Sequence, residues 1–359
     1  MVNVFGTTMS KREFLRYFGD ATAFAGIVPM TLENGKAAGV KALRIFTGAG
    51  LDFTVLPGRA MDIAWASYNS KSLVFISKTG VTSPIFYEAR NKDFLRTFYG
   101  GLLTTCGLTY FGSPNLDNGE ELSLHGREAN NVAEDVSIHQ TWDGDELILS
   151  VEGRMREAQM FGENLILTRK IWVKAGENII HLEDSIENLG FVTQPFMVLY
   201  HINYGYPLVS PETKLYTASS EVIPRDEEAV ADDGVANYSI FEPPIAGYKE
   251  KCFFHTFRTD SEGNTTLALI NESLNLGIWQ RWNINELPAF TQWKNLLEGD
   301  YVLGLEPGTA TPIGRSKVRE QGQLLMIEPG EMKHVGIEFG VMESPDKFTL
   351  IKDQIDRLN

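Results

Sequence analysis

The sequence predicts an all-β fold, a large antiparallel sandwich with a short helix near its N-terminus. Three observations predict it: short apolar or alternating segments recur along the chain, turn residues separate them, and helical periodicity is scarce after residue 20. A run of strands without alternating helices favours an antiparallel sandwich over a doubly wound parallel sheet.

The clearest helical signal lies within residues 1–20, which we expect to form an N-terminal helical extension. Ser10 can cap a first turn, and Glu13 follows three residues later, as in a capping box. Phe14, Leu15 and Phe18 then form one apolar stripe.

The strands are expected from residue 41 onward. Residues 41–68 contain two or three of them, separated by Gly-Ala-Gly and Pro-Gly turns. Asp143-Gly144 is a typical hairpin turn before the next long run. The further predicted strands lie within residues 145–157, 163–176, 177–190, 193–208, 263–273, 276–283, 301–308, 322–331 and 334–342.

One segment breaks this pattern. Residues 221–250 are acidic and proline-rich, with weak periodicity. Because large all-β folds often exceed 250 residues as one unit, we expect a single domain over residues 1–359. Residues 221–250 are then a long surface excursion or a lid over a site, not a linker.

Composition excludes several partners. The net charge is −15 with a pI near 4.9, which argues against binding nucleic acid. No apolar run approaches the roughly 18 residues of a membrane span, and the N-terminus lacks the apolar core of a signal peptide. With only two cysteines, Cys106 and Cys252, a reducing cytoplasmic setting is expected. A homodimer is left open.

The six histidines do not suggest a metal site. None has the His-Glu-x-x-His spacing, and the cysteines do not form Cys-x-x-Cys, so a dedicated zinc site is not expected. His139, His181 and His334 lie in strand patterns with charged neighbours, and His255 is compatible with a core position.

Two histidines have neighbours that suggest a ligand site. His125 precedes Gly126, Arg127 and two asparagines, a pattern compatible with a ligand site or with a well-formed turn. His201 is followed by Asn203 and Tyr204, and amides with aromatics commonly line sugar sites. Read alone, His201 is more simply a hydrogen-bonded core residue.

A carboxylate and a polar cluster add to these histidines. Glu306 interrupts the apolar strand of residues 301–308, and a buried carboxylate needs a partner; a surface turn is the alternative. Gln292, Trp293 and Lys294 precede it in the sequence, and polar and aromatic side chains of this kind often line pockets. Weaker candidates, because such residues at strand ends are usually structural, are Arg59, Asp62 and Arg96.

Five segments, in order, resemble one family. "GRAMDI", "GGLLTTCGL", "LHGRE", "LYHINYGYPL" and "LGLEPGT" are similar to the aldose 1-epimerase (galactose mutarotase-like) superfamily, especially its poorly characterised bacterial branch. The resemblance covers most of the chain. It implies a large twisted β-supersandwich whose site occupies a groove on one sheet.

The resemblance also implies an isomerase and roles for single residues. His201 is then the general acid, Glu306 the general base, and His125 a sugar-binding or transition-state-stabilising group. Arg59 or Arg96 takes the place of the substrate-contacting arginine. The chain departs from the typical Asn-x-x-His-Gly-Gly segment because Arg127 follows Gly126, which adds charge beside the substrate.

The expected reaction interconverts the anomers of a free sugar without a metal or redox cofactor. A base removes the C1 hydroxyl proton while an acid protonates the ring oxygen. We expect His201 and Glu306 to face each other across one groove. Their opposite charges are expected to keep the glutamate ionised and the histidine protonated near neutral pH.

Two alternatives remain at this stage. An epimerase or isomerase of an anionic sugar is suggested by four arginines near the motifs, Arg59, Arg90, Arg96 and Arg127. A sugar-binding module without turnover is the other, and a large separation between His201 and Glu306 would favour it.

Overall fold

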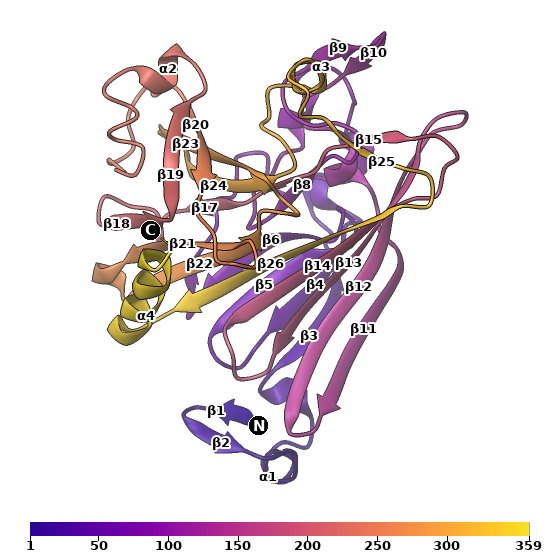
Figure 1. Cartoon of the computed structure of the whole chain (residues 1–359). Helices are drawn as coiled ribbons and strands as arrows, with labels where there is room; N and C mark the ends of the chain where they lie inside the picture. The colour runs from indigo at the N-terminus through magenta and orange to yellow at the C-terminus, as the bar shows by residue number, and fades with distance from the viewer. Residues whose placement is uncertain (359) are drawn as a thin grey trace.

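Long strands with alternating buried and exposed side chains form the largest sheet in the computed structural model, which describes residues 1–358. All neighbouring strands in it pair antiparallel (Figure 1). In order of pairing the eight strands are β11 (Glu134–Asp143), β12 (Glu146–Ala158), β13 (Asn164–Lys174), β14 (Ile179–Asn188), β26 (Met332–Met342), β22 (Leu276–Asn283), β21 (Asn264–Asn271) and β18 (Thr213–Thr217).

A seven-stranded sheet carries most of the segments that the sequence analysis singled out. Its pairing order is β19 (Ser219–Pro224), β20 (Lys251–Phe257), β23 (Ala289–Leu297), β24 (Asp300–Gly308), β16 (Leu199–His201) and β8 (Thr104–Cys106), with β17 (Asn203–Gly205) also on β24. A five-stranded sheet holds β3 (Gly26–Thr31), β4 (Lys41–Phe46), β5 (Leu51–Leu56), β6 (Asp62–Tyr68) and β7 (Lys71–Ser72).

Smaller elements complete residues 1–358. Two-stranded ribbons join β1 (Val2–Val4) to β2 (Thr7–Met9), β9 (Asn115–Asp117) to β10 (Glu120–Leu122), and β15 (Gln194–Phe196) to β25 (Leu325–Ile327). The α-helices are α1 (Lys11–Tyr17), α2 (Glu227–Val230), α3 (Arg315–Glu320) and α4 (Pro345–Asp356). The 3₁₀ turns are η1 (Ala21–Ala23), η2 (Gly35–Ala37), η3 (Pro84–Phe86), η4 (Asp93–Arg96), η5 (Glu128–Asn130) and η6 (Glu272–Leu274).

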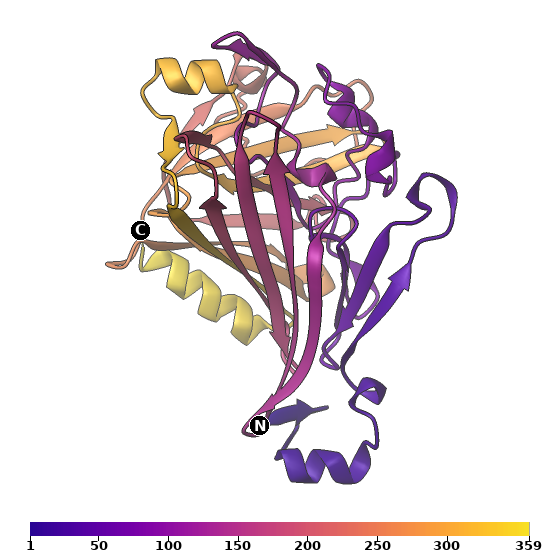
Figure 2. The same ribbon diagram turned by 90° about the vertical axis from the view of Figure 1, so that its right-hand side faces the viewer.

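The predicted all-β sandwich is therefore confirmed, including strands at each predicted position. The long neighbouring strands of the largest sheet are seen in magenta in Figure 2. Strand β26, near the end of the chain, lies between β14 and β22 and joins the two halves of this sheet. No helix within residues 1–358 has the length and apolar character to cross a membrane.

One main core lies between the three large sheets. Tyr200, Ile202 and Tyr204 point into it from the seven-stranded sheet. A buried polar network crosses it, because Arg169 on β13 binds Asp184 at 2.7 Å and Asp62 at 2.8 Å. Since successive side chains of a strand face opposite sides, His201 faces away from this core.

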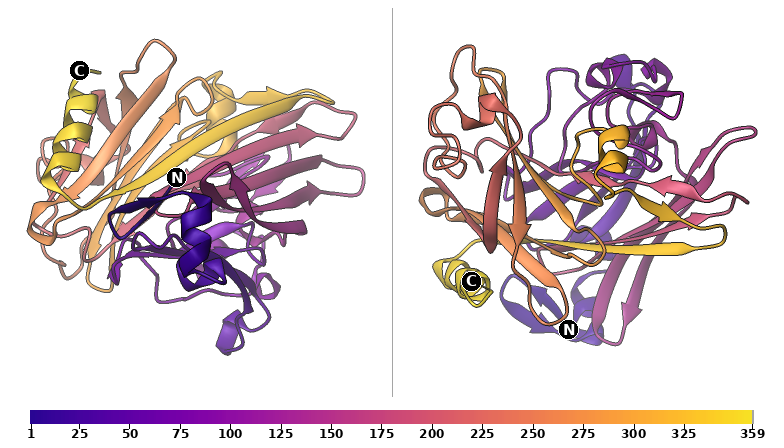
Figure 3. Two further views of the ribbon diagram at one scale, coloured as in Figure 1. Left: turned by 90° about the horizontal axis from the view of Figure 1, so that it is seen from below. Right: turned by 45° about the horizontal axis from the view of Figure 1, so that its top comes forward.

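The predicted N-terminal helix is confirmed as α1. Ser10 caps it, and the Ser10–Glu13 capping box is complete. The sequence analysis missed α4, although Ser344 caps it and Pro345 occupies its first turn, both ordinary start signals. Helix α4 packs Phe348, Ile351 and Ile355 on the outer face of the eight-stranded sheet (Figure 3).

The predicted excursion of residues 221–250 begins inside β19 and contains α2. Its backbone carbonyls accept bonds from the seven-stranded sheet: Gln292 Nε2 donates to Tyr238 at 2.7 Å, and Lys294 Nζ donates to Asn237 at 2.9 Å. The excursion therefore covers the face of the sheet on which Gln292 and Lys294 lie.

Candidate functional site

A cavity of about 230 Å³ lies over the other face of the seven-stranded sheet. Its walls come from four strands of that sheet and from loops that pack on them. The lining residues are Lys92, Phe94, Leu95, Phe98, Ser113, Pro114, Leu124, His125, His201, Arg225, Glu250, Cys252, Thr291, Trp293, Glu306 and Pro312.

Strand register brings the polar lining together. Thr291 on β23 pairs directly with Glu306 on β24, and Trp293 pairs with Gly304, so Thr291, Trp293 and Glu306 share one face. A Cβ on Gly304 would come within 2.2 Å of Glu306 Oε1. The glycine at position 304 therefore leaves the space that the Glu306 carboxyl group occupies.

His201 and Glu306 meet at the bottom of this cavity. His201 Nδ1 lies 3.2 Å from Glu306 Oε1, and the side chains are 7% and 2% exposed. Neither atom has a partner with hydrogen-bond geometry among residues 1–358. A buried polar atom without a partner costs free energy, so this pair needs an explanation beyond packing.

Burial opposes the predicted charge state of this pair, which is an ionised Glu306 and a protonated His201. Burial is the largest cause that lowers the pKa of His201 well below its usual value, with His125 lowering it further. Burial also raises the pKa of Glu306 well above its usual value, and the Glu250 carboxylate adds to the increase. Both shifts favour the neutral side chains, because separated charges lose solvation in a buried site.

His125 forms a third polar group of the cavity. Its ring lies 5.6 Å from that of His201 and 5.1 Å from that of Phe94. Its Nδ1 has no hydrogen-bond partner in the described chain. Burial lowers the pKa of His125 to about 4, so the ring is neutral near pH 7 and can both donate and accept. Its backbone φ of 60° is uncommon for a non-glycine residue, a feature often found at functional sites.

Trp293 forms an aromatic wall held by the ends of the excursion. Its ring centroid is 5.4 Å from that of His201. Trp293 Nε1 donates to Glu250 Oε2 at 2.8 Å, and Arg225 Nη2 donates to Glu250 Oε1 at 3.2 Å. Sequence reasoning missed Arg225 and Glu250, because only the pairing of β19, β20 and β23 brings them beside Trp293.

Removing this support gives a prediction for substrate binding. Glu250→Ala deletes the acceptor of the Trp293 indole, so the ring loses its fixed orientation. If the cavity binds a sugar, as the sequence motifs predict, KM should rise several-fold, whereas kcat should change less because His201 and Glu306 stay in place. Steady-state kinetics checks this, and an unchanged KM would contradict the role of Glu250.

Arg59 does not line the cavity, which corrects its predicted role. It is completely buried, its Nε donates to the Ala129 carbonyl at 2.7 Å, and its Nη2 donates to the Thr97 carbonyl at 3.2 Å. Its third donor binds the Thr82 carbonyl. Arg59 therefore holds together the backbone of three loops near the site.

Arg59→Lys tests this corrected role. A lysine cannot reproduce the planar fork of three donors, and hydrogen bonds to charged groups contribute about 1.5–3 kcal/mol each. We expect the free energy of unfolding to fall by about 3 kcal/mol or more, measured by urea titration. The anomer exchange that the sequence motifs predict should stay near wild type per folded molecule, whereas a raised KM with intact stability would favour substrate contact.

Asp62, Arg96 and Arg127 also lie outside the cavity lining. Asp62 is buried in the core network, where it accepts from Thr105 Oγ1 at 2.7 Å. The Arg96 side chain is 80% exposed and pairs with Asp93 at 3.3 Å. Arg127 lies over the Tyr110 ring, 5.1 Å from its centroid. None of the three is placed to contact a ligand beside His201.

The other predicted site residues belong to strands of the seven-stranded sheet, and the face on which each side chain lies decides whether it can reach the cavity. Asn203 donates to the His201 carbonyl at 2.8 Å and supports the strand that carries it. Tyr204 points into the core, where its hydroxyl donates to Gln280 at 2.9 Å. Gln292 and Lys294 flank Trp293 and face the excursion, because neighbours in a strand point to opposite sides. Of the predicted set, His125, His201, Trp293 and Glu306 line the cavity.

Burial of His255 agrees with its core interpretation. Its Nδ1 lies 2.9 Å from Ser219 Oγ and its Nε2 lies 3.1 Å from Gln292 Oε1. The excursion, considered above as a lid, covers this same side of the sheet. Only its two ends, at Arg225 and Glu250, reach the cavity.

The sequence matches one family model, and the fold matches several solved structures. A family model described as "Domain of unknown function (DUF4432)" matches residues 37–341, and no curated protein matches the sequence. A Klebsiella pneumoniae structure, provisionally named an aldose 1-epimerase, has a TM-score of 0.88 at 22% identity, covering 92% of this chain and 87% of its own.

Two further structures are more distant. A galactose mutarotase-like protein from Clostridium acetobutylicum has a TM-score of 0.61 at 14% identity, covering 90% of this chain and 100% of its own. A galactose 1-epimerase from Lactobacillus acidophilus has a TM-score of 0.59 at 13% identity, covering 89% and 99%. At these identities the likeness establishes the fold, which is galactose mutarotase-like, as the sequence motifs predicted.

Proposed function

This chain belongs to the family described as domain of unknown function (DUF4432), and we propose that it is an aldose 1-epimerase that interconverts the anomers of a free sugar. The observation that carries the proposal is the 3.2 Å approach of His201 Nδ1 and Glu306 Oε1 inside one small cavity. The likeness to structures named as aldose 1-epimerases gives further support.

The size of the cavity supports a single sugar ring. Pockets for drug-sized ligands usually enclose about 300–1,000 Å³, whereas this one encloses about 230 Å³. Its lining combines the Trp293 and Phe98 rings with the polar groups of His125, His201 and Glu306. Such a combination can pack against the apolar face of a sugar and bind its hydroxyl groups.

Anomer exchange needs an acid and a base close together, because both reacting oxygens are bonded to C1. Glu306 accepts the proton of the C1 hydroxyl while His201 donates a proton to the ring oxygen. The C1–O5 bond breaks to leave an aldehyde, which rotates and exposes its other face. Ring closure then returns both protons, so the pair ends as it began.

The pair must hold one proton in total for this cycle. Burial favours that proton on Glu306, since it raises the pKa of Glu306 and lowers that of His201. Hydroxyl groups of a bound sugar replace part of the lost solvation and so stabilise the charged arrangement, in which the proton is on His201. The catalytic groups therefore titrate as a pair.

The lowered pKa of His201 predicts where the acid limb of the pH profile lies. The pair gains a second proton only below the usual histidine pKa of about 6.5, because the pKa of His201 is lowered. It loses its single proton only well above the usual glutamate pKa of about 4.3, because the pKa of Glu306 is raised. We therefore expect kcat/KM to fall on the acid side only below about pH 6.5; an acid midpoint at or above that value would contradict the pair.

The anionic-sugar alternative loses its original support. The arginines that suggested it, Arg59, Arg90, Arg96 and Arg127, are absent from the cavity lining. Of the cations that do line it, Arg225 pairs with Glu250 at 3.2 Å, and Lys92 is the other. The cluster of arginines that would suit bidentate capture of a phosphate or sulfate is therefore not part of the cavity lining.

The binding-module alternative is disfavoured by the same short distance, because binding alone does not require a paired acid and base. Exchange spectroscopy by NMR over a panel of reducing sugars tests the proposal. Acceleration of at least one sugar above the buffer rate is expected. If no sugar is accelerated while one binds in the cavity, the protein is a binding module.

A further inference from the structure

A groove of about 740 Å³, which we call the side groove, lies next to the cavity of the acid–base pair, the main cavity. Along β20, Cys252 lines the main cavity and Phe254, two residues later, lines the side groove. Along β23, Thr291 and Ala289 are divided in the same way, and Arg225 lines both. Residues two apart in a strand share one face, so the main cavity and the side groove are neighbours on one face of the seven-stranded sheet.

Three apolar side chains of the side groove lack packing partners in the core. Ile223 and Leu325 are 46% and 40% exposed, and Phe254 is half-buried. Within residues 1–358, none of the three belongs to a buried hydrophobic cluster. Single exposed apolar residues are common on proteins, but several that line one groove form a patch of the kind that marks a ligand site.

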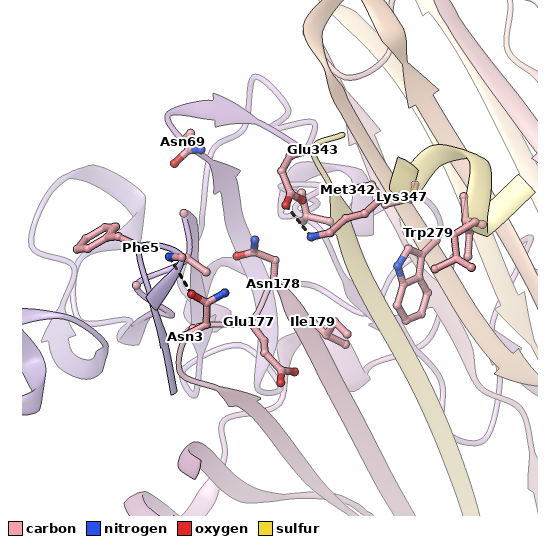
Figure 4. Close-up of a pocket in the computed structure, with 18 of the residues that line it drawn as sticks. Asn3, Phe5, Asn69, Glu177, Asn178, Ile179, Trp279, Met342, Glu343 and Lys347 are labelled. Carbon is pink, nitrogen blue, oxygen red and sulfur yellow. Dashed lines mark hydrogen bonds and ion pairs between the residues drawn. The ribbon is translucent and has the colours of Figure 1, made fainter. Parts of the chain in front are cut away.

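The cavity of about 700 Å³ in Figure 4 differs in this respect. Its aromatic side chain, Trp279, is already in contact on both sides. The Arg281 guanidinium lies 5.2 Å from the ring centroid, and a Cβ on Gly340 would come within 2.1 Å of the indole. Phe254 has no ring–ring or cation–ring contact among the described residues, so the side groove is the better candidate for an apolar ligand.

One row of side chains runs from the acid–base pair into the side groove. Glu306 pairs with Thr291 on β23. Thr291 pairs with Phe254 on β20, and Phe254 pairs with Ile223 on β19. Neighbouring strands lie about 4.8 Å apart, so two strand spacings, about 10 Å, separate Glu306 from Phe254.

His201 stands at the other end of this row. Strands β16 and β17 pair with β24 on the edge away from β23. Their register on β24 places His201 opposite Glu306. From β16 to β19 the row therefore reads His201, Glu306, Thr291, Phe254 and Ile223.

The proposed roles of the pair fix the direction of a sugar ring along this row. C1 of the sugar is bonded to the ring oxygen on one side and to C2 on the other. With the ring oxygen at His201 and the C1 hydroxyl at Glu306, C2 lies on the side of Thr291. A group attached to C2 is then directed toward Phe254 and Ile223.

The charges at the junction of the two hollows do not favour an anionic group. Arg225, which lines both, is already paired with Asp226 at 2.6 Å and with Glu250 at 3.2 Å. An anion on the substituent would have to compete with these two carboxylates for the guanidinium. The apolar lining and the paired arginine both favour an uncharged substituent.

We propose that the side groove binds an apolar substituent on C2 of the sugar, such as the acyl chain of a 2-acylamino sugar. The proposal rests on the proposed function, because the roles of His201 and Glu306 set the direction of the ring. Burial of the chain removes apolar area of Ile223, Phe254 and Leu325 from water. A longer chain reaches further along the row and buries more of this area.

N-acyl derivatives of glucosamine, galactosamine and mannosamine test the proposal, because they keep a free C1 hydroxyl. NMR exchange spectroscopy gives kcat/KM for the acetyl, butanoyl and hexanoyl compounds of each sugar. A buried methylene group improves binding by roughly fourfold. We therefore expect the hexanoyl compound of at least one sugar to exceed its acetyl compound by about tenfold or more. The same chains on an amine at C6 should give no gain, because C6 lies beyond the ring oxygen, on the side of His201.

Variants of the side groove connect this gain to its lining. Ile223→Ser and Phe254→Ser should each reduce the ratio of the hexanoyl to the acetyl kcat/KM. Because this ratio compares two substrates of one protein sample, a loss of folded protein cancels out of it. Ile85→Ser is the matched control, since Ile85 is 82% exposed and lines neither the main cavity nor the side groove. A ratio that stays at the wild-type value in both groove variants, or that falls equally in Ile85→Ser, would overturn the proposal.

Failure of this proposal and failure of the proposed function give different results. Exchange of glucose, galactose or mannose without any gain from longer acyl chains would reject the side groove alone. A protein that accelerates no sugar, with or without an acyl chain, would reject the proposed function and the side groove with it.

Discussion

Glu306→Gln is expected to lower kcat for anomer exchange by roughly 10²–10⁴-fold, the contribution of a well-placed acid or base. Glutamine has nearly the same shape and keeps an acceptor near His201, but it cannot take the C1 hydroxyl proton. His201→Ala should cause a loss of similar size. NMR exchange rates, measured on the sugar that wild type accelerates best, give both values.

A variant that carries both Glu306→Gln and His201→Ala, together with a control variant, tests whether the two residues act as a unit. Because His201 and Glu306 share one proton in the proposed mechanism, removing both should cost little more than removing one, as with residues that act as a unit. His255→Asn is the matched control, since His255 is also a buried histidine of this sheet but faces away from the cavity. Wild-type exchange in either single variant would reject the assigned roles.

Gly304→Ala is expected to lower kcat by about 10²-fold, although it changes no reacting group. The new Cβ would lie 2.2 Å from Glu306 Oε1 and 3.0 Å from Trp293 Cβ. The carboxyl group must therefore move, and a misplacement near 1 Å can cost about 10²-fold in rate. KM should rise less, because His125 and Phe98 are not displaced.

Gly336→Ala provides the control for this change. Gly336 lies in β26, and a Cβ added there meets no atom within 4 Å. The exchange rate of Gly336→Ala should match that of wild type. Circular dichroism should show that Gly304→Ala and Gly336→Ala both keep the wild-type fold. A Gly304→Ala enzyme as fast as Gly336→Ala would show that the position of Glu306 does not limit the reaction.

Local patterns in the sequence were enough to predict most of the fold. The capping box of Ser10 and Glu13 and the alternating runs of β12 and β13 depend on contacts between near neighbours or on strand periodicity. Helix α4 carried the same kind of local signal in Ser344 and Pro345, so it was predictable and was overlooked.

The same periodicity could have corrected part of the predicted site. Tyr204 lies three residues after His201, and Gln292 and Lys294 are the direct neighbours of Trp293. In regular strands such positions face the opposite side from the cavity residue. Grouping residues by nearness in sequence instead of by strand face placed these three in the site.

The sequence by itself determined the strands, the family likeness and the candidates His125, His201, Trp293 and Glu306. Only the tertiary structure decided that Arg225 and Glu250 join them, that Arg59 holds loop carbonyls, and that burial favours a neutral His201–Glu306 pair. The physical reason is that solvation and cross-strand distance depend on which strands become neighbours. Which strands become neighbours is determined by the packing of the whole chain, and it cannot be predicted from a local sequence pattern.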